Sequence, residues 1–199
     1  KAIVIDTQSP TVASVTSTSN DGTYKIGDVI PITVTFSEAV SIVGGPQITL
    51  ETGDTDAVVN YTSGSGSSTL TFNYTVSEGE SSSDLDYAST SALGLNNGTI
   101  KDASGNNATL TLAAPGAANS LGNAKAIVVD GIRATVTSVT STVADNNYDI
   151  GEIIPIVVNF SEVVTVTGTP QITLETGTAD AVVNYTSGTG TNALTFNYT

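Results

Sequence analysis

Residues 27–40 read GDVIPITVTFSEAV. The apolar residues of this stretch take every second place: Ile30, Ile32, Val34 and Phe36. A period of two is typical of a strand that buries one face against a core. Pro31 interrupts the pattern and has no backbone N–H, so it predicts a place near a sheet edge or at a bulge.

A second alternating run follows at residues 70–76, after a turn rich in Gly and Ser that separates it from residues 58–62. This pair predicts a hairpin. Further turns stand at residues 20–22, 96–98 and 104–106, built from Asn, Asp, Ser and Gly. Because the strands are short and no helical periodicity appears, the sequence predicts an all-β fold made of antiparallel β-sandwich domains.

The chain contains an internal repeat. Residues 1–75 align without gaps on residues 125–199, and about two-thirds of the aligned positions are identical. PQITLETG at residues 46–53, for example, returns unchanged at residues 170–177. The offset of 124 residues is the length of a domain and not of a solenoid repeat. We therefore expect one full repeat and one incomplete repeat of a tandem array.

The phase of the repeat sets the domain boundaries. KAIVID opens the chain and is followed by a polar linker that ends at Pro10, so we expect it to be a final strand. The alternative makes it the first strand of its own domain. The predicted organisation has three parts: residues 1–8 as the last strand of a preceding domain plus linker, residues 9–131 as a complete sandwich repeat, and residues 132–199 as a second repeat that is incomplete at its C-terminal end. The lack of any Met also suggests a piece of something longer.

Composition excludes several classes of chemistry. The 199 residues include 5 Lys and Arg against 19 Asp and Glu, a net charge of −14, and contain no Cys, His, Met or Trp. Disulfides, thiolate or imidazole metal sites and histidine-dependent nucleophiles are therefore excluded. So few cations predict no binding to nucleic acid, and no apolar run is long enough to cross a membrane. At 39% hydrophobic residues the chain can form a core.

The motifs GDVIPITVTFSEAV, PQITLETG, SDLDYAS and GTIKDASGNNATLTL, with the KAIVID junction, resemble the bacterial Ig-like repeats of giant secreted or surface-anchored adhesins, of the cyanobacterial and marine long-repeat type. The resemblance implies Ig-like sandwiches in tandem that serve as the stalk or extender of an adhesin or fibre outside the cell. It also implies calcium at or near domain junctions. The second junction, residues 130–134, departs from the pattern because it has no Pro and carries Arg133.

Carboxylates provide the candidate metal site. Asp102, Ser104 and Asn106 place oxygen-bearing side chains at positions one, three and five of a loop, a spacing that suits calcium, or alternatively an Asx-type turn. Strand direction predicts that Asp6 and Glu38 meet this loop at one pole of the domain. Three converging carboxylates would repel one another without a cation; the alternative is that each is a solvated loop charge. The predicted calcium ligands are Asp6, Glu38, Asp102, Asn106 and the second-copy residues Asp130 and Glu162.

Two further acids form a weaker candidate. Asp84 and Asp86 flank Leu85, and alternation would place both carboxylates on one face, as a second cation site or as a solvated face. Paired carboxylates also catalyse glycoside hydrolysis. Because most acids of this chain lie in the repeated scaffold, we expect no catalysis.

The sequence thus predicts a calcium-stiffened, non-catalytic extender repeat on the bacterial cell surface. Its expected partners are neighbouring copies of the same repeat and other chains in a fibre. Two alternatives stay open. One is a glycan- or surface-binding module, and the other is a filament subunit assembled by strand exchange between chains.

Overall fold

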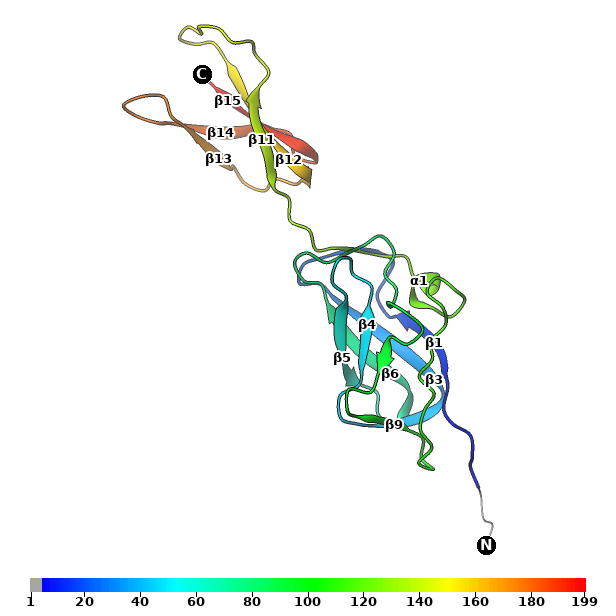
Figure 1. Ribbon diagram of the computed structural model, residues 1–199. Helices are drawn as coiled ribbons and strands as arrows, with labels where there is room; N and C mark the ends of the chain where they lie inside the picture. Colours follow the sequence, from blue (N-terminus) through cyan, green and yellow to red (C-terminus); the bar gives the residue numbers. More distant parts are fainter. Residues whose placement is uncertain (1–4) are drawn as a thin grey trace. The chain divides into compact units, whose positions relative to one another are not determined.

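The computed structural model describes residues 5–199 and divides them into two compact units, the first ending at Ile132 and the second beginning at Arg133. Apart from one short helix in the first unit, the regular structure of both units is β-strand (Figure 1).

The first unit holds ten strands and the helix. They are β1 (Val12–Ser17), β2 (Gly22–Lys25), β3 (Val29–Val43), β4 (Gln47–Leu50), β5 (Ala57–Ser63), β6 (Ser67–Thr75), β7 (Ser81–Ser82), β8 (Leu93–Gly94), β9 (Thr99–Lys101), α1 (Leu121–Ala124) and β10 (Ile127–Asp130).

Most of these strands pair antiparallel. One sheet has the order β1-β3-β6-β5-β4-β8, with β9 paired to the end of β3, and a second has the order β2-β10-β7. β5 takes part in two pairings, because its first half pairs with β4 and its second half, from Tyr61, pairs with β6. The only parallel strand pair in residues 5–132 is β10 with β2. The prediction of an antiparallel Ig-like β-sandwich is confirmed.

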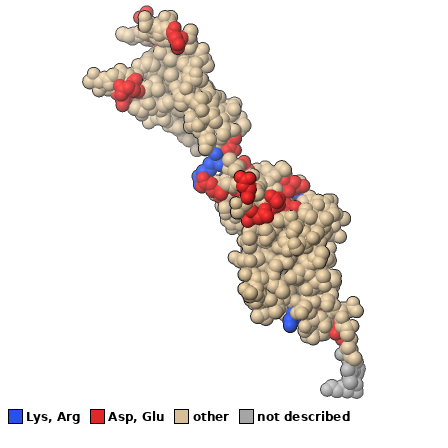
Figure 2. Space-filling view, viewed as in Figure 1, with Lys and Arg blue, Asp and Glu red and all other residues tan. Residues whose placement is uncertain are grey.

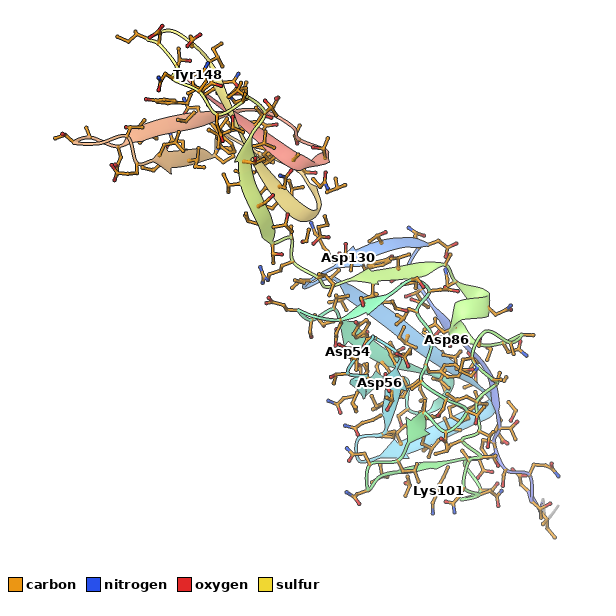
Figure 3. All side chains as sticks on the ribbon, turned by 45° about the horizontal axis from the view of Figure 1, so that its top comes forward. Asp54, Asp56, Asp86, Lys101, Asp130 and Tyr148 are labelled. Atoms are coloured by element: carbon orange, nitrogen blue, oxygen red, sulfur yellow. The ribbon has the colours of Figure 1, made fainter. Side chains whose placement is uncertain are left out.

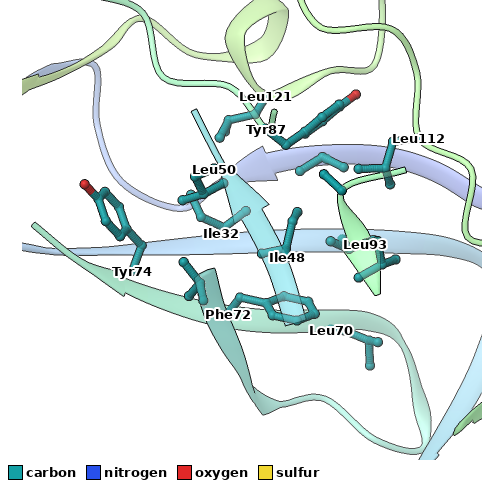
Figure 4. Close-up of a cluster of buried hydrophobic side chains, with 14 of the residues drawn as sticks. Ile32, Ile48, Leu50, Leu70, Phe72, Tyr74, Tyr87, Leu93, Leu112 and Leu121 are labelled. Carbon is teal, nitrogen blue, oxygen red and sulfur yellow. The ribbon is translucent and has the colours of Figure 1, made fainter. Parts of the chain in front are cut away.

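The core of the first unit contains the two predicted alternating runs. Ile30, Ile32, Val34 and Phe36 of β3 are at most 2% exposed, as are Leu70, Phe72, Tyr74 and Val76 in and just after β6. Later segments of the unit close the core from the other side with side chains that include Tyr87, Leu93, Leu112 and Leu121 (Figure 4). The period-two pattern therefore identified the inward-facing residues correctly.

Pro31 lies in a different setting from the one predicted. β3 is an interior strand, flanked by β1 and β6, and not an edge strand. Proline is tolerated there because β1 ends opposite Ile32, at the pair Ser17↔Ile32, so no ladder bond needs an N–H from Pro31 on that side. Its carbonyl accepts a 2.8 Å hydrogen bond from the Ser17 hydroxyl.

The second unit repeats the first half of this fold. Its strands are β11 (Val136–Ser141), β12 (Ile154–Val164), β13 (Gln171–Leu174), β14 (Ala181–Ser187) and β15 (Thr191–Tyr198), in the sheet order β11-β12-β15-β14-β13. The edge-to-face contact between Tyr61 and Phe72, with ring centroids 6.1 Å apart at 76°, recurs with the same values between Tyr185 and Phe196.

The second copy of the repeated opening segment lies at the end of the first unit. Residues 127–130 form β10, which pairs with β2 and β7 of that unit. Of the first copy, residues 1–4 lie outside the described part of the chain.

Candidate functional site

Three carboxylates from distant parts of the sequence lie together in the first unit. Asp6 precedes β1, Glu38 lies in β3 two residues after the buried Phe36, and Asp102 follows β9. Oxygen atoms of the three side chains all lie within 4.8 Å of one another. Asp6 is exposed, Glu38 is half-buried and Asp102 is 5% exposed.

Strand pairing explains why these residues meet. β9 pairs with the end of β3 at Ser41↔Lys101, and this brings the next residue, Asp102, beside β3. On the other side of Glu38, the backbone N–H of Ser37 donates a 2.9 Å hydrogen bond to the Thr11 carbonyl, and the Thr11 N–H donates to the Ser37 hydroxyl over 3.1 Å. The segment that carries Asp6 is thereby held along β3.

The loop after β9 forms the Asx-type turn that was the alternative to a metal loop. The Asp102 carboxylate accepts hydrogen bonds from the Asn106 backbone N–H over 2.8 Å and from the Asn106 side-chain amide over 2.7 Å. The same loop also reaches Asp6, because the Ser104 hydroxyl donates to Oδ2 of Asp6 over 3.1 Å. The turn therefore joins Asp6 to Asp102.

Asn106 presents a donor to the carboxylates. Its Nδ2 donates to the Asp6 carbonyl over 3.3 Å as well as to Asp102. To bind calcium, the Asn106 side chain would have to rotate so that its amide oxygen replaces Nδ2 beside the carboxylates, since only the amide oxygen can bind a cation.

The electrostatics of the cluster differ between its members. Burial raises the pKa of the Glu38 carboxyl, and the nearby charges of Asp102 and Asp6 raise it further. For Asp102, burial acts in the same direction, but hydrogen bonds from Asn106 and from the backbone of Ser104 and Gly105 outweigh it and hold the pKa below its usual value. The negative charge of Glu38 is therefore less well stabilised than that of Asp102.

The match to known proteins covers this site and most of the first unit. A family model described as a bacterial Ig-like domain matches residues 6–115, more than half of the chain. The chain belongs to the bacterial Ig-like domain family. Bacterial Ig-like domains are typically non-catalytic modules found outside the cell or at its surface. A comparison with curated proteins gave no match.

One negative finding concerns membranes. Within residues 5–199, no helix of this bacterial Ig-like chain has both the length and the apolar character that a membrane crossing requires.

The other two predicted ligands lie in different units of this bacterial Ig-like chain. Asp130 ends β10 in the first unit, where its Oδ1 accepts from the Ile132 N–H over 3.4 Å. Asp130 lies at the opposite end of that unit from Lys101 (Figure 3). Lys101 directly precedes Asp102 in the sequence. Glu162 lies in β12 of the second unit, and its Oε1 is buried with no hydrogen-bond partner in the described part of the chain.

Contrary to the prediction, Asp84 and Asp86 do not share a face. Asp84 is exposed, whereas Asp86 is 8% exposed and accepts hydrogen bonds of 2.9 Å from the backbone N–H groups of Tyr87 and Gly116. Alternation does not apply here because residues 83–86 form no strand. Asp86 therefore has a structural role, because it holds the turn at residue 116 against the core. Burial of Tyr87 raises the pKa of its hydroxyl to about 12, and the nearby charge of Asp86 contributes to this rise.

The role of Glu80 was not predicted from the sequence. Its Oε2 accepts from the Tyr74 hydroxyl over 2.7 Å and from the Ser77 N–H over 2.6 Å. Burial, followed by this contact with Glu80, raises the pKa of Tyr74 well above its usual value. The spacing Ser77-x-x-Glu80 is that of a capping box, in which a carboxylate reaches back to an N–H three residues earlier, and it was the available signal.

Glu80 also lies in the more acidic part of the unit. Acidic side chains gather over one end of the first unit (Figure 2). Four of them, Asp54, Asp56, Glu78 and Glu80, line a pocket of about 250 Å³. Hydrogen bonds from Tyr74 and Ser77 hold the Glu80 carboxylate at this pocket, to which we assign no ligand.

Proposed function

We propose that this chain is an extender repeat of a bacterial adhesin or surface fibre, and that calcium bound by Asp6, Glu38 and Asp102 stiffens the N-terminal end of its first domain. The proposed partners are further copies of the same repeat, joined end to end, and other chains of the fibre. The family assignment supports a structural module outside the cell. The observation that carries the calcium part is the convergence of three carboxylates within 4.8 Å.

The spacing and chemistry of the cluster support this ion. Calcium binds carboxylate and carbonyl oxygens at about 2.3–2.6 Å, so oxygens on opposite sides of it are about 5 Å apart. A divalent cation would also neutralise the mutual repulsion that raises the pKa of Glu38. The Asp6 carbonyl, which faces Asn106, is a further oxygen close by.

The position of the cluster gives the ion a structural effect. Asp6 belongs to the segment that leads into β1, whereas Glu38 and Asp102 belong to the body of the domain. A cation held by all three would fix that segment to the domain.

Calorimetric melting in calcium and in chelator tests the proposal, with Glu38→Gln as the test variant. Calcium at a hundred times its Kd stabilises a domain by about 2.7 kcal/mol, so we expect the melting of the first unit to rise by about 5–10 °C. Glu38→Gln should remove most of this rise. Glu162→Gln is the matched control and should retain it. An unchanged melting curve in chelator would refute the calcium part.

Two further measurements test the proposed stiffening and the proposed location at the cell surface. Backbone relaxation of residues 5–11 should show slower, more restricted motion when calcium is added. Antibodies raised against the chain should label intact cells of the bacterium that makes it. Labelling only after the cells are broken would refute the surface role.

A groove that occurs in both units supports a second candidate, the glycan-binding module. It opens where β5 leaves β6, has a volume of about 510 Å³, and is lined by polar residues that include Asn60, Tyr61 and Asn73. The groove of about 650 Å³ in the second unit is lined by the counterparts Asn184, Tyr185 and Asn197. Binding to a glycan array that is lost in Asn60→Ala with Asn184→Ala would support this candidate, and an array without hits would exclude it.

A further inference from the structure

The groove between β5 and β6 has the same lining in both units. Each of the nine residues that line it in the second unit is identical to its counterpart in the first. Several of these side chains point into solvent: Val58 is 57% exposed and its counterpart Val182 is 59% exposed, and Asn60 and Asn73 are exposed as well. Exposed side chains contribute little to stability, so folding does not require them to be identical.

Other exposed segments differ between the two copies. Residues 7–9, which are all exposed, differ at every position from their counterparts. Five of the seven residues in 19–25 differ, and so do four of the five in 65–69, at the β5–β6 hairpin. A duplication too recent for change would have left these segments identical too. Neither folding nor recent duplication therefore accounts for the unchanged groove.

Hydrogen bonds hold the polar side chains of the groove in the same arrangement in both units. Nε2 of Gln47 donates to Oδ1 of Asn60 over 2.8 Å, and the Asn73 N–H donates to the Thr62 hydroxyl over 3.2 Å. The counterpart bonds in the second unit measure 2.8 Å and 3.3 Å. Within the described residues, no hydrogen bond uses Nδ2 of Asn60 or the side-chain amide of Asn73. These groups are free to bind a ligand.

The chemistry of the lining favours an uncharged sugar. A carboxamide offers both a donor and an acceptor, as does every sugar hydroxyl. Val58 lies two residues before Asn60 on the same face of β5 and offers an apolar surface beside the amide. Glu80 is the one acid or base among the lining residues of the first groove, and it borders the acidic pocket that includes Asp54 and Asp56. Negative charge there repels an anionic ligand.

We propose that each groove binds a short stretch of an uncharged polysaccharide, and that the two grooves of one chain bind repeated stretches of the same polymer. The inference rests on the glycan-binding candidate above and adds the charge and the polymeric nature of the ligand. A polymer of one repeating unit presents the same group to two identical sites. Because the sites are linked in one chain, the second binding event becomes intramolecular, and the affinity of the pair exceeds that of either site.

The class of ligand is tested by surface plasmon resonance with the 199-residue chain. The immobilised probes are three uncharged polysaccharides, dextran, laminarin and galactomannan, and two anionic ones, dextran sulfate and alginate. At least one uncharged polymer should bind the chain, and the anionic polymers should not. Binding to none of the five, or to the anionic polymers alone, overturns the proposal. Hits on the array of short glycans without binding to these polymers would leave the glycan-binding candidate in place and refute this inference alone.

Variants of single grooves test the use of two sites. Asn73→Ala and Asn197→Ala each remove the free amide from one groove, so each should weaken binding to the polymer at least tenfold. The two together should abolish binding. A tetrasaccharide of the same sugar should bind to each single variant with unchanged Kd and half the number of sites. Thr23→Ala is the control, because Thr23 is exposed in β2 and differs between the copies, and it should bind as the native chain does.

A second pair of variants covers a loss of folding. If melting shows that a variant at Asn73 or Asn197 is unfolded, Asn60→Ala and Asn184→Ala take their place, with the same expected results. Single variants that bind the polymer as tightly as the native chain would overturn the proposal. A polymer that binds no more tightly than its tetrasaccharide would overturn it as well.

Discussion

The hydroxyl of Ser104 donates a hydrogen bond of 3.1 Å to Oδ2 of Asp6, and so joins residues 98 positions apart in the chain. This bond brings the segment before β1 into the carboxylate cluster of Glu38 and Asp102. The cluster is therefore part of the folded domain.

The first prediction concerns pH in the absence of divalent cations. Because the folded-state pKa of Glu38 is raised above 4.5, its protonated form contributes stability at low pH, and this contribution is lost as pH rises through the folded pKa. In chelator, Glu38→Gln should therefore melt higher than the native chain at pH 7 and at a similar temperature at pH 4. In calcium at pH 7 the order should reverse. Melting curves in the four conditions measure it, and a variant that is less stable in chelator at pH 7 would contradict it.

The second prediction concerns the buried carboxylate of Asp86. Asp86→Asn keeps the shape of the side chain but replaces an oxygen acceptor by an amide donor, facing the N–H groups of Tyr87 and Gly116. We expect a loss of about 1.5–3 kcal/mol in the free energy of unfolding of the first unit. The exposed neighbour gives the control, since Asp84→Asn should change it by less than about 0.5 kcal/mol. Urea unfolding measures both, and equal effects would contradict the structural role of Asp86.

The third prediction concerns the Tyr74 hydroxyl. Tyr74→Phe removes its bond to Glu80 and should lower the stability of the first unit by about 1–2 kcal/mol. Tyr198 is the counterpart of Tyr74, and a counterpart of Glu80 does not occur in residues 133–199. Tyr198→Phe should therefore have a smaller effect on the second unit. Alkaline titration at 295 nm gives an independent check, because the raised pKa of Tyr74 should keep it protonated until the domain unfolds.

The fourth prediction concerns the end of the first unit. The N–H of Gly131 donates to the Glu80 carbonyl over 2.8 Å, and its own carbonyl accepts from the Gly79 N–H over 2.9 Å. A Cβ at Gly131 would lie 2.2 Å from the Ser77 carbonyl oxygen, so Gly131→Ala should destabilise the first unit by about 1–3 kcal/mol. A Cβ at Gly45 would meet nothing within 4 Å, and Gly45→Ala should be close to neutral. Equal melting temperatures for the two variants would contradict the assignment.

Alternation and repetition made much of the fold predictable. The period-two runs of β3 and β6 identified their inward faces because each strand buries one face only. The interior position of β3 was not predictable from Pro31, since that position depends on where the neighbouring strand β1 ends. The shared face of Asp84 and Asp86 was predicted wrongly because alternation was applied to residues that form no strand.

The site was predictable to the extent that strand direction determines it. The proposed meeting of Asp6, Glu38 and Asp102 followed from which ends of the strands share a pole, and their oxygens lie within 4.8 Å of one another. Calcium itself stays a prediction. The orientation of Asn106 was not accessible from sequence, because an amide can present either its oxygen or its nitrogen to a neighbour.

The parallel pairing of β10 with β2 has a mechanical consequence. Ile127 lies opposite Gly22 and Asp130 lies opposite Lys25, so the two strands run in the same direction. Tension between the chain ends of the unit would reach β2 from its Gly22 end and β10 from its Asp130 end, and it would draw them apart along their length. Such shear loads the interstrand hydrogen bonds together, whereas a pull across the strands would break them one after another. Once tension reaches β2, residues 127–130, the second copy of the segment that opens the chain, are thus expected to resist extension of the first unit through their bonds to β2.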